Sequence, residues 1–152
     1  MLKRFQKDWK MFFLNVIADD DMFMPERAHA GDAGADLRSI EDYTISPGQT
    51  ALVNTGIKLE IPYGYVGFLI SRSGHGKYPV SLANCVGVID HQYRGYIYAR
   101  LENRSSDVFH IRRGDRVAQI IIQPVVLPEF KKVTVLTTTT RGEAGFGSTG
   151  VQ

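Results

Sequence analysis

The residues of this chain that could do chemistry gather in five short clusters, each containing glycine and polar or charged side chains. The clusters are AGADL (33–37), SRSG (71–74), GVIDHQYRG (87–95), RRGDRVAQ (112–119) and RGEAGFGSTG (141–150). Taken singly, each has an ordinary structural explanation, because Asp36 can cap a turn, Arg72 can form an ion pair and residues 113–115 are a common hairpin turn. Each cluster stands where a strand would end, and together they indicate a polar site assembled from several turns.

The last cluster has two interpretations. Its glycines and hydroxyls surround one arginine, Arg141, and one aromatic residue, Phe146. A segment with so few apolar side chains cannot bury enough surface to fold alone, which is typical of a disordered tail. The same residues also suit a clamp for phosphate and a base, because glycines let backbone N–H groups approach phosphate oxygens and arginine adds further donors.

The sequence lacks the residue spacings that are typical of other common catalytic and metal sites. The four histidines (His29, His75, His91 and His110) show no H-x-E, H-x-x-x-H or C-x-x-C pattern, so a zinc site is not indicated. No G-x-S-x-G or Walker A motif occurs. Cys85, the single cysteine, is expected to be a buried small hydrophobic residue and needs no oxidising compartment.

The elements that must position these clusters are short strands. Residues 57–61 alternate Ile57, Leu59 and Ile61 with charged residues, and residues 96–103 alternate in the same way, which is the pattern of half-buried strands. Further strands are expected at 12–17, 43–46, 50–54, 65–70, 117–126 and 130–136, with residues 74–84 as an irregular connection. Turns recur about every 8–12 residues, so the chain is predicted to be an all-β sandwich, barrel or jelly roll.

The size and the net charge of the chain limit the classes of function that it can have. The chain has 152 residues, 43% of them hydrophobic, which fits one globular domain. A formal net charge of +2 argues against non-specific nucleic-acid binding. No apolar run reaches the roughly 18–20 residues of a membrane span, and the basic start, residues 1–11, lacks a cleavage site. We therefore expect a cytoplasmic protein with neither a membrane nor a nucleic-acid partner.

In their order and spacing, the five clusters closely resemble the five motifs of the trimeric dUTP pyrophosphatases, or dUTPases. The most specific matches are GVID followed by YRG (87–95) and the ending RGEAGFGSTG (141–150), and the resemblance spans roughly residues 12 to 150. It implies a jelly-roll-like β subunit with a flexible C-terminal arm. It divides the chain into a short basic lead-in (1–11), a β domain (12–136) and the arm (137–152).

The resemblance also implies the reaction. Members of this family hydrolyse dUTP to dUMP and pyrophosphate with Mg²⁺, which keeps uracil out of DNA and supplies dUMP for thymidylate synthesis. They are homotrimers whose active sites are shared between subunits. Asp90 matches the general base that activates the water attacking the α-phosphorus, and a carboxylate is suited to accept that proton. Asp36 matches a carboxylate that holds metal-bound water, so no direct protein ligand to Mg²⁺ is expected.

The other site residues implied by the resemblance fall into two groups, one for the phosphates and one for the nucleoside. The phosphate group is Arg72, Ser73, Gly74 and Gln119, with Arg141, Gly147, Ser148 and Thr149 as the clamp on the γ-phosphate. The nucleoside group is Asn84 and the hairpin Gly87, Val88 and Ile89 for uracil, Tyr93 under the deoxyribose and Phe146 stacking on the base.

Some positions depart from the family pattern. Gln92 and Tyr96 stand where many relatives carry Asp and Glu, and the connection after Gly74 is about one residue short. A dCTP deaminase or a bifunctional dCTP deaminase/dUTPase is the nearest alternative, but Arg100 stands where those enzymes place a catalytic Glu, and arginine stays protonated. A non-enzymatic β-sandwich that binds partners is a second alternative, although it would not need Asp90, Arg72 and Gln119 together.

Overall fold

The structure is a computed structural model that describes residues 13–73 and 80–145. Within these ranges the chain forms eleven strands and one short 3-10 helix. They are β1 (Asn15–Ala18), η1 (Asp21–Phe23), β2 (Ala35–Arg38), β3 (Tyr43–Ile45), β4 (Thr50–Asn54), β5 (Ile57–Glu60), β6 (Tyr65–Ile70), β7 (Val80–Leu82), β8 (Val86–Ile89), β9 (Tyr98–Asn103), β10 (Phe109–Ile111) and β11 (Arg116–Pro124). The all-β prediction is confirmed.

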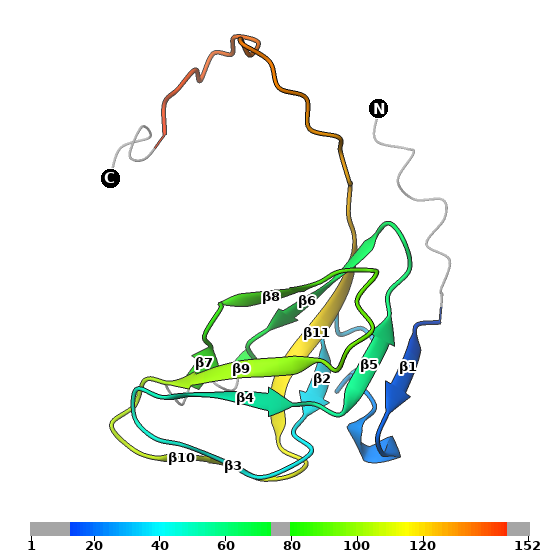
Figure 1. Ribbon diagram of the computed structural model, residues 1–152, viewed down its shortest axis with the longest axis vertical. Coiled ribbons are helices and arrows are strands. Elements are labelled where there is room, and N and C mark those ends of the chain that lie inside the picture. The colour runs from blue at the N-terminus through cyan, green and yellow to red at the C-terminus, as the bar shows by residue number, and fades with distance from the viewer. Residues whose placement is uncertain (1–12, 74–79, 146–152) are drawn as a thin grey trace.

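The strands form two larger sheets and two short ribbons, and every pairing between strands is antiparallel (Figure 1). The larger sheets have the orders β2-β11-β6-β8 and β4-β9-β7, and the ribbons are β1-β5 and β10-β3. Neighbours in these sheets are often far apart in sequence, as β2 and β11 are. This non-local pairing gives the jelly-roll-like arrangement, and it places the ends of distant strands beside one another.

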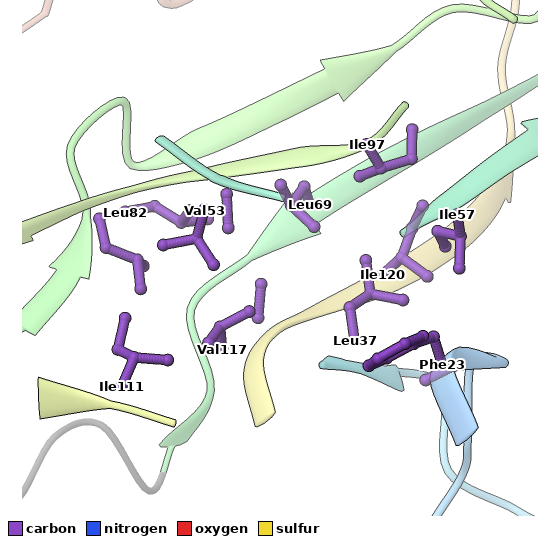
Figure 2. Packing of buried hydrophobic residues seen from close by; sticks show 14 of the residues in the cluster. Phe23, Leu37, Val53, Ile57, Leu69, Leu82, Ile97, Ile111, Val117 and Ile120 are labelled. Carbon is purple, nitrogen blue, oxygen red and sulfur yellow. The ribbon is translucent and has the colours of Figure 1, made fainter. Parts of the chain in front are cut away.

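The hydrophobic core receives side chains from both larger sheets (Figure 2). Leu37, Leu69 and Ile120 come from β2, β6 and β11, and they pack in one cluster with Val53 of β4 and Leu101 of β9. All five are at most 3% exposed. Replacing one such leucine by alanine typically costs about 2–5 kcal/mol, so this cluster fixes how the two sheets lie on each other.

The alternation read from the sequence predicts the buried faces correctly. Ile57, Leu59 and Ile61 are buried, whereas Glu60 between them is exposed. In β9 the buried face carries Ala99, Leu101 and Asn103. The side chain of Asn103 is satisfied inside the core, because its amide donates to the carbonyls of Ile45 and Asp107, each at 2.8 Å.

Three predictions about strand positions are wrong. The first strand begins at Asn15, three residues later than expected, where pairing with β5 starts. Residues 80–82 of the supposed irregular connection form β7, which gains a partner in β9. Residues 130–136 form no strand, and their apolar side chains are exposed, because none of the described strands pairs with them.

Cys85 is exposed and does not occupy the core as expected. It lies in the turn between β7 and β8, where its backbone has a φ of 59°. The Cys85 N–H donates to the Leu82 carbonyl at 3.1 Å, so a tight turn and not packing determines the residue's position.

After β11 the chain leaves the sheets as an extended segment, residues 125–145, which Figure 1 shows in orange to red running away from the body. The Val125 N–H still donates to the Gly64 carbonyl at 2.9 Å. Beyond that point the described side chains are exposed, including Phe130 at 98% and Val126 at 84%. Among the described residues, no helix is long and apolar enough to cross a membrane.

Candidate active site

The first part of the site is a pocket at one end of the four-stranded sheet, with a volume of about 310 Å³. Its lining includes Asp36, Arg72, Ser73 and Gln119, which come from three of the five clusters. The strand register explains this meeting. Gln119 of β11 lies opposite Asp36 of β2 on one side and opposite Ile70 of β6 on the other, and Arg72 follows Ile70 by two residues.

Asp36 and Arg72 form a two-pronged ion pair. Arg72 Nε donates to Asp36 Oδ1 at 2.7 Å, and Arg72 Nη2 donates to Oδ2 at 3.3 Å. Arg116 Nε lies 3.5 Å from the same Oδ2 atom. A guanidinium group has five N–H donors, so this pair orients Arg72 and still leaves three of its N–H groups for another anion.

Gln119 is held between the residues that follow β6 and the turn that precedes β2. Its side-chain Nε2 donates to the Ser71 carbonyl at 3.2 Å. Its Oε1 lies so close to Gly34 that a Cβ atom at position 34 would collide with it. Glycine is therefore required at position 34 if the Gln119 amide is to keep this position in the pocket.

The second part of the site is a pocket of about 210 Å³ beside β8. Asp90 and Tyr93 line it together with Val88, Ile89 and Tyr96, and with Ile97 and Tyr98. Asp90 follows the last residue of β8, and its side chain makes no hydrogen bond or ion pair to any described residue. Its carboxylate is therefore available to accept a proton from a bound water.

Gly87, Val88 and Ile89, which the resemblance assigns to uracil, lie on an edge strand. β8 pairs with β6 on one side only and is the last strand of its sheet, so main-chain groups on its outer side are not used by a described strand. Gly87 is buried against β6, where an added Cβ would come within 3.1 Å of Leu69 Cβ. Asn84 precedes the strand, and its Nδ2 donates to the Val86 carbonyl at 3.3 Å, which leaves its side-chain oxygen free for a ligand.

Residue order and register place the two pockets apart. Ile89 pairs with Gly67 and Val86 pairs with Ile70, so Asp90 stands at the start of β6 while Arg72 follows its end. One step beyond Ile89, Asp90 lies level with Val66, six residues before Arg72. At about 3.3 Å per residue, the backbones of Asp90 and Arg72 are separated by roughly 20 Å along the strand.

Two kinds of comparison identify the family. A family model described as dUTPase matches residues 20–150. The chain belongs to the dUTPase family. The deoxyuridine 5'-triphosphate nucleotidohydrolase of Rhodococcus erythropolis is 47% identical over 134 residues, which cover 87% of this chain and 82% of that protein.

Solved structures of dUTPases have the same fold. The dUTPase of Staphylococcus bacteriophage 80alpha with dUPNHPP superposes with a TM-score of 0.85 and 32% identity, covering 93% of this chain and 100% of that one. A variant dUTPase from phage phi11 of S. aureus has a TM-score of 0.75 and 30% identity, covering 82% and 98%. That structure reveals the coordination of a structural Mg(II) ion.

Not every dUTPase motif residue falls within the described chain. Arg141 does, and its Nε donates to the Ala144 carbonyl at 3.0 Å within the exposed arm. Gly74, Phe146, Gly147, Ser148 and Thr149 lie outside the described residues. For these five positions the dUTPase resemblance of the sequence is the only guide.

The structure adds residues that the motif comparison did not assign. Asp32 lines the first pocket, Tyr96 and Tyr98 line the second, and Arg116 shares the Asp36 carboxylate. Ser71 ties the end of β6 to β7, because its hydroxyl accepts the Leu82 N–H at 2.9 Å. Asp32, Ser71 and Arg116 each stand within two residues of a motif cluster or inside one, and this proximity is the only signal that the sequence offers for them.

Proposed function

We propose that this chain hydrolyses dUTP to dUMP and pyrophosphate through attack of an Asp90-activated water on the α-phosphorus. The observation that carries the proposal is the first pocket, where Arg72, Ser73 and Gln119 offer N–H and O–H donors around a space that suits a phosphate chain. Membership of the dUTPase family, this pocket, and an Asp90 carboxylate that pairs with no described residue together support the phosphate site and the base that the proposed reaction needs.

Asp90 supplies the proton acceptor. A neutral water that attacks a charged phosphate must lose a proton, and the exposed carboxylate at the end of β8 can take it. Because no described side chain neutralises Asp90, its role does not require the breaking of an existing ion pair.

The phosphate chain is held from two directions. Arg72, Ser73, Gly74 and Gln119 contact it from the sheet, with the spare N–H groups of Arg72 as the strongest donors. Arg141, Gly147, Ser148 and Thr149 of the arm close over the γ-phosphate. The extended and exposed course of residues 125–145 supports this assignment, since the described part of the arm, residues 137–145, is fully exposed and extends away from the sheets.

The nucleoside is recognised by residues of β8 together with Asn84, Tyr93 and Phe146. Uracil and cytosine exchange a donor and an acceptor at position 4 and N3, so fixed main-chain groups of Gly87, Val88 and Ile89 pair with one base and not with the other. Asn84 adds a side-chain partner and Phe146 stacks on the base. Tyr93 packs under the deoxyribose and leaves no room for a 2′-hydroxyl.

The pocket fits a magnesium nucleotide better than a bare magnesium ion. Among the described residues there is no group of three or more His, Cys, Asp or Glu side chains that could hold a metal. Arg72 and Arg116 already contact the Asp36 carboxylate and balance its charge. Asp36 therefore suits a contact to metal-bound water better than direct ligation of the metal. Mg²⁺ carried by the phosphates would neutralise charge and align the α-phosphorus, consistent with its tendency to keep several waters.

The active site is shared between copies of the chain in a homotrimer. The separation of roughly 20 Å between Asp90 and Arg72 along β6 supports this, because both must reach the same triphosphate. A second copy that brings its β8 loop to the first pocket satisfies both requirements. Closed rotational symmetry then repeats the site at each interface.

The alternative reactions have less support. Arg100, at the position where deaminases carry the catalytic Glu, is exposed on β9 and lines neither pocket. As a permanently protonated group it cannot relay a proton during loss of the amine. A purely structural protein would not require donors converging on an open, polar pocket.

The direct test is pyrophosphate release from dUTP, dCTP, dTTP and UTP in parallel, with Mg²⁺ and with an EDTA control. Release from dUTP alone, abolished by EDTA, is the expected result. Ammonia from dCTP would assign the chain to the deaminases. Absence of turnover with every nucleotide, in a folded sample, would reject catalysis and leave only nucleotide binding.

A further inference from the structure

The loop between β8 and β9, residues 90–97, carries both Asp90 and Tyr93, so its conformation determines the second pocket. The loop has no regular secondary structure beyond a turn, in which the Tyr93 N–H donates to the Asp90 carbonyl at 3.0 Å. Its shape must therefore come from specific side-chain bonds. Tyr93 and Tyr96 make two of these.

Tyr93 is folded back along its own loop. Its hydroxyl donates to the Tyr96 carbonyl at 2.9 Å. A Cβ atom at Gly95 would collide with that same hydroxyl, so the ring lies directly over the glycine. The position of the Tyr93 ring thus depends on where the Tyr96 main chain is held.

Tyr96 is fixed from outside the loop. Its hydroxyl donates to Asp19 Oδ1 at 2.8 Å, and the Lys58 ammonium group lies 4.4 Å from the centre of its ring. Asp19 is itself anchored, because its N–H donates to the Gly56 carbonyl at 2.9 Å. The hydrogen bond to Asp19, together with the carboxylate charge, raises the pKa of Tyr96 and keeps its hydroxyl protonated as a donor.

We propose that Tyr96, anchored on Asp19, is a positioning residue for sugar selection: it fixes the carbonyl that holds Tyr93 in place under the deoxyribose. The inference rests on the proposed dUTP hydrolysis and deepens it. Loss of the anchor lets the Tyr93 ring move by a fraction of its width, which opens space for a 2′-hydroxyl. The consequence is weaker discrimination between dUTP and UTP, with a smaller effect on the turnover of dUTP.

The experiment compares kcat/KM for dUTP and for UTP in Tyr96→Phe, Asp19→Ala and the double variant. Tyr96→Phe removes one hydroxyl and keeps the ring under Lys58. Each single variant should lower the dUTP/UTP ratio about fivefold, the size of effect expected for one lost hydrogen bond, and the double variant should lower it no further. Asp19→Asn keeps an acceptor oxygen and should preserve most of the ratio.

Tyr63→Phe is the matched control. Tyr63 also contacts this loop, through a ring contact with His91 at 5.3 Å between centroids, but its hydroxyl bonds to no described residue. Its removal should leave the ratio unchanged. An unchanged ratio in folded Asp19→Ala and Tyr96→Phe, an equal fall in Tyr63→Phe, or additive losses in the double variant would overturn the inference. A wild-type protein with no preference for dUTP would instead overturn the proposed function.

Discussion

Asp90 and Arg72 lie at opposite ends of one antiparallel strand pair, β6 and β8. Asp90 follows the end of β8 beside the start of β6, and Arg72 follows the end of β6 beside the start of β8. Arg72 is placed with Asp36 and Gln119 by the register of three strands, whereas Asp90 belongs to a separate pocket. Under the proposed function, one dUTP therefore takes these two residues from two copies of the chain.

Replacing Asp90 by asparagine should separate catalysis from binding. The amide has nearly the shape of the carboxylate but cannot accept the proton of the attacking water, so turnover should fall by about 10²–10⁴-fold. Affinity for a non-hydrolysable dUTP analogue, measured by calorimetry, should change little. Asp107→Asn, at an exposed loop position outside both pockets, is the control. Parallel loss of binding and turnover in Asp90→Asn would indicate misfolding and not loss of a base.

Gly34→Ala should weaken phosphate binding through Gln119. The new Cβ would occupy the place of Gln119 Oε1, so the amide must leave its present position. We expect KM for dUTP to rise several-fold while the protein still folds. Gly31→Ala is the matched control, since nothing lies within 4 Å of a Cβ there. Equal KM values in the two variants would show that Gln119 does not contact the phosphates.

The sequence predicts the alternating strands well, because period-2 patterning has a direct physical cause in one buried and one exposed face. It fails at residues 130–136, where apolar residues at strand-like spacing pair with none of the strands that the structure describes. Cys85 is exposed where the sequence predicts burial, because a tight turn overrides the usual burial of a small sulfur-containing side chain.

The site is indicated by the set of five motifs together and not by any single residue. Nothing in the order of the sequence shows that Asp36, Arg72 and Gln119 meet, because their proximity depends on pairing between β2, β11 and β6. The anchoring of Tyr96 on Asp19 is a contact across 77 positions of sequence, and no local pattern marks it. Such long-range contacts are decided by tertiary structure.

Removal of the chain from Arg141 onward should leave a folded protein that hydrolyses dUTP very poorly. The described part of this segment is exposed, so its loss removes no core packing. The measurement is kcat/KM beside the thermal unfolding midpoint. Removal of Val151 and Gln152 alone is the control and should leave activity intact. Full activity in the longer truncation would refute the phosphate clamp.

Alkaline pH should destabilise the fold partly through Tyr43. Burial raises the pKa of this phenol above the ordinary tyrosine value of 10.0, and the hydroxyl donates to Glu41 at 2.6 Å. The folded state therefore holds the proton more tightly than the unfolded state. The resulting stabilisation is fully present below about pH 10 and is lost as pH rises through the folded pKa.

Denaturant unfolding at several pH values tests whether the stabilisation from Tyr43 falls as the pH rises. The difference in unfolding free energy between wild type and Tyr43→Phe should shrink above pH 10. A difference that grows with pH would mean that the phenol is easier to ionise in the folded state.

Mixing two inactive variants tests the shared site most directly. Asp90→Asn and Arg72→Ala are each purified, then unfolded and refolded together in equal amounts, and pyrophosphate release from dUTP is measured. If each site takes Asp90 from one copy and Arg72 from another, about a quarter of the sites in randomly mixed trimers regain both residues, and activity returns towards that fraction of wild type. Activity no higher than that of the separately refolded variants would contradict the account, because it would place Asp90 and Arg72 of one copy in the same site.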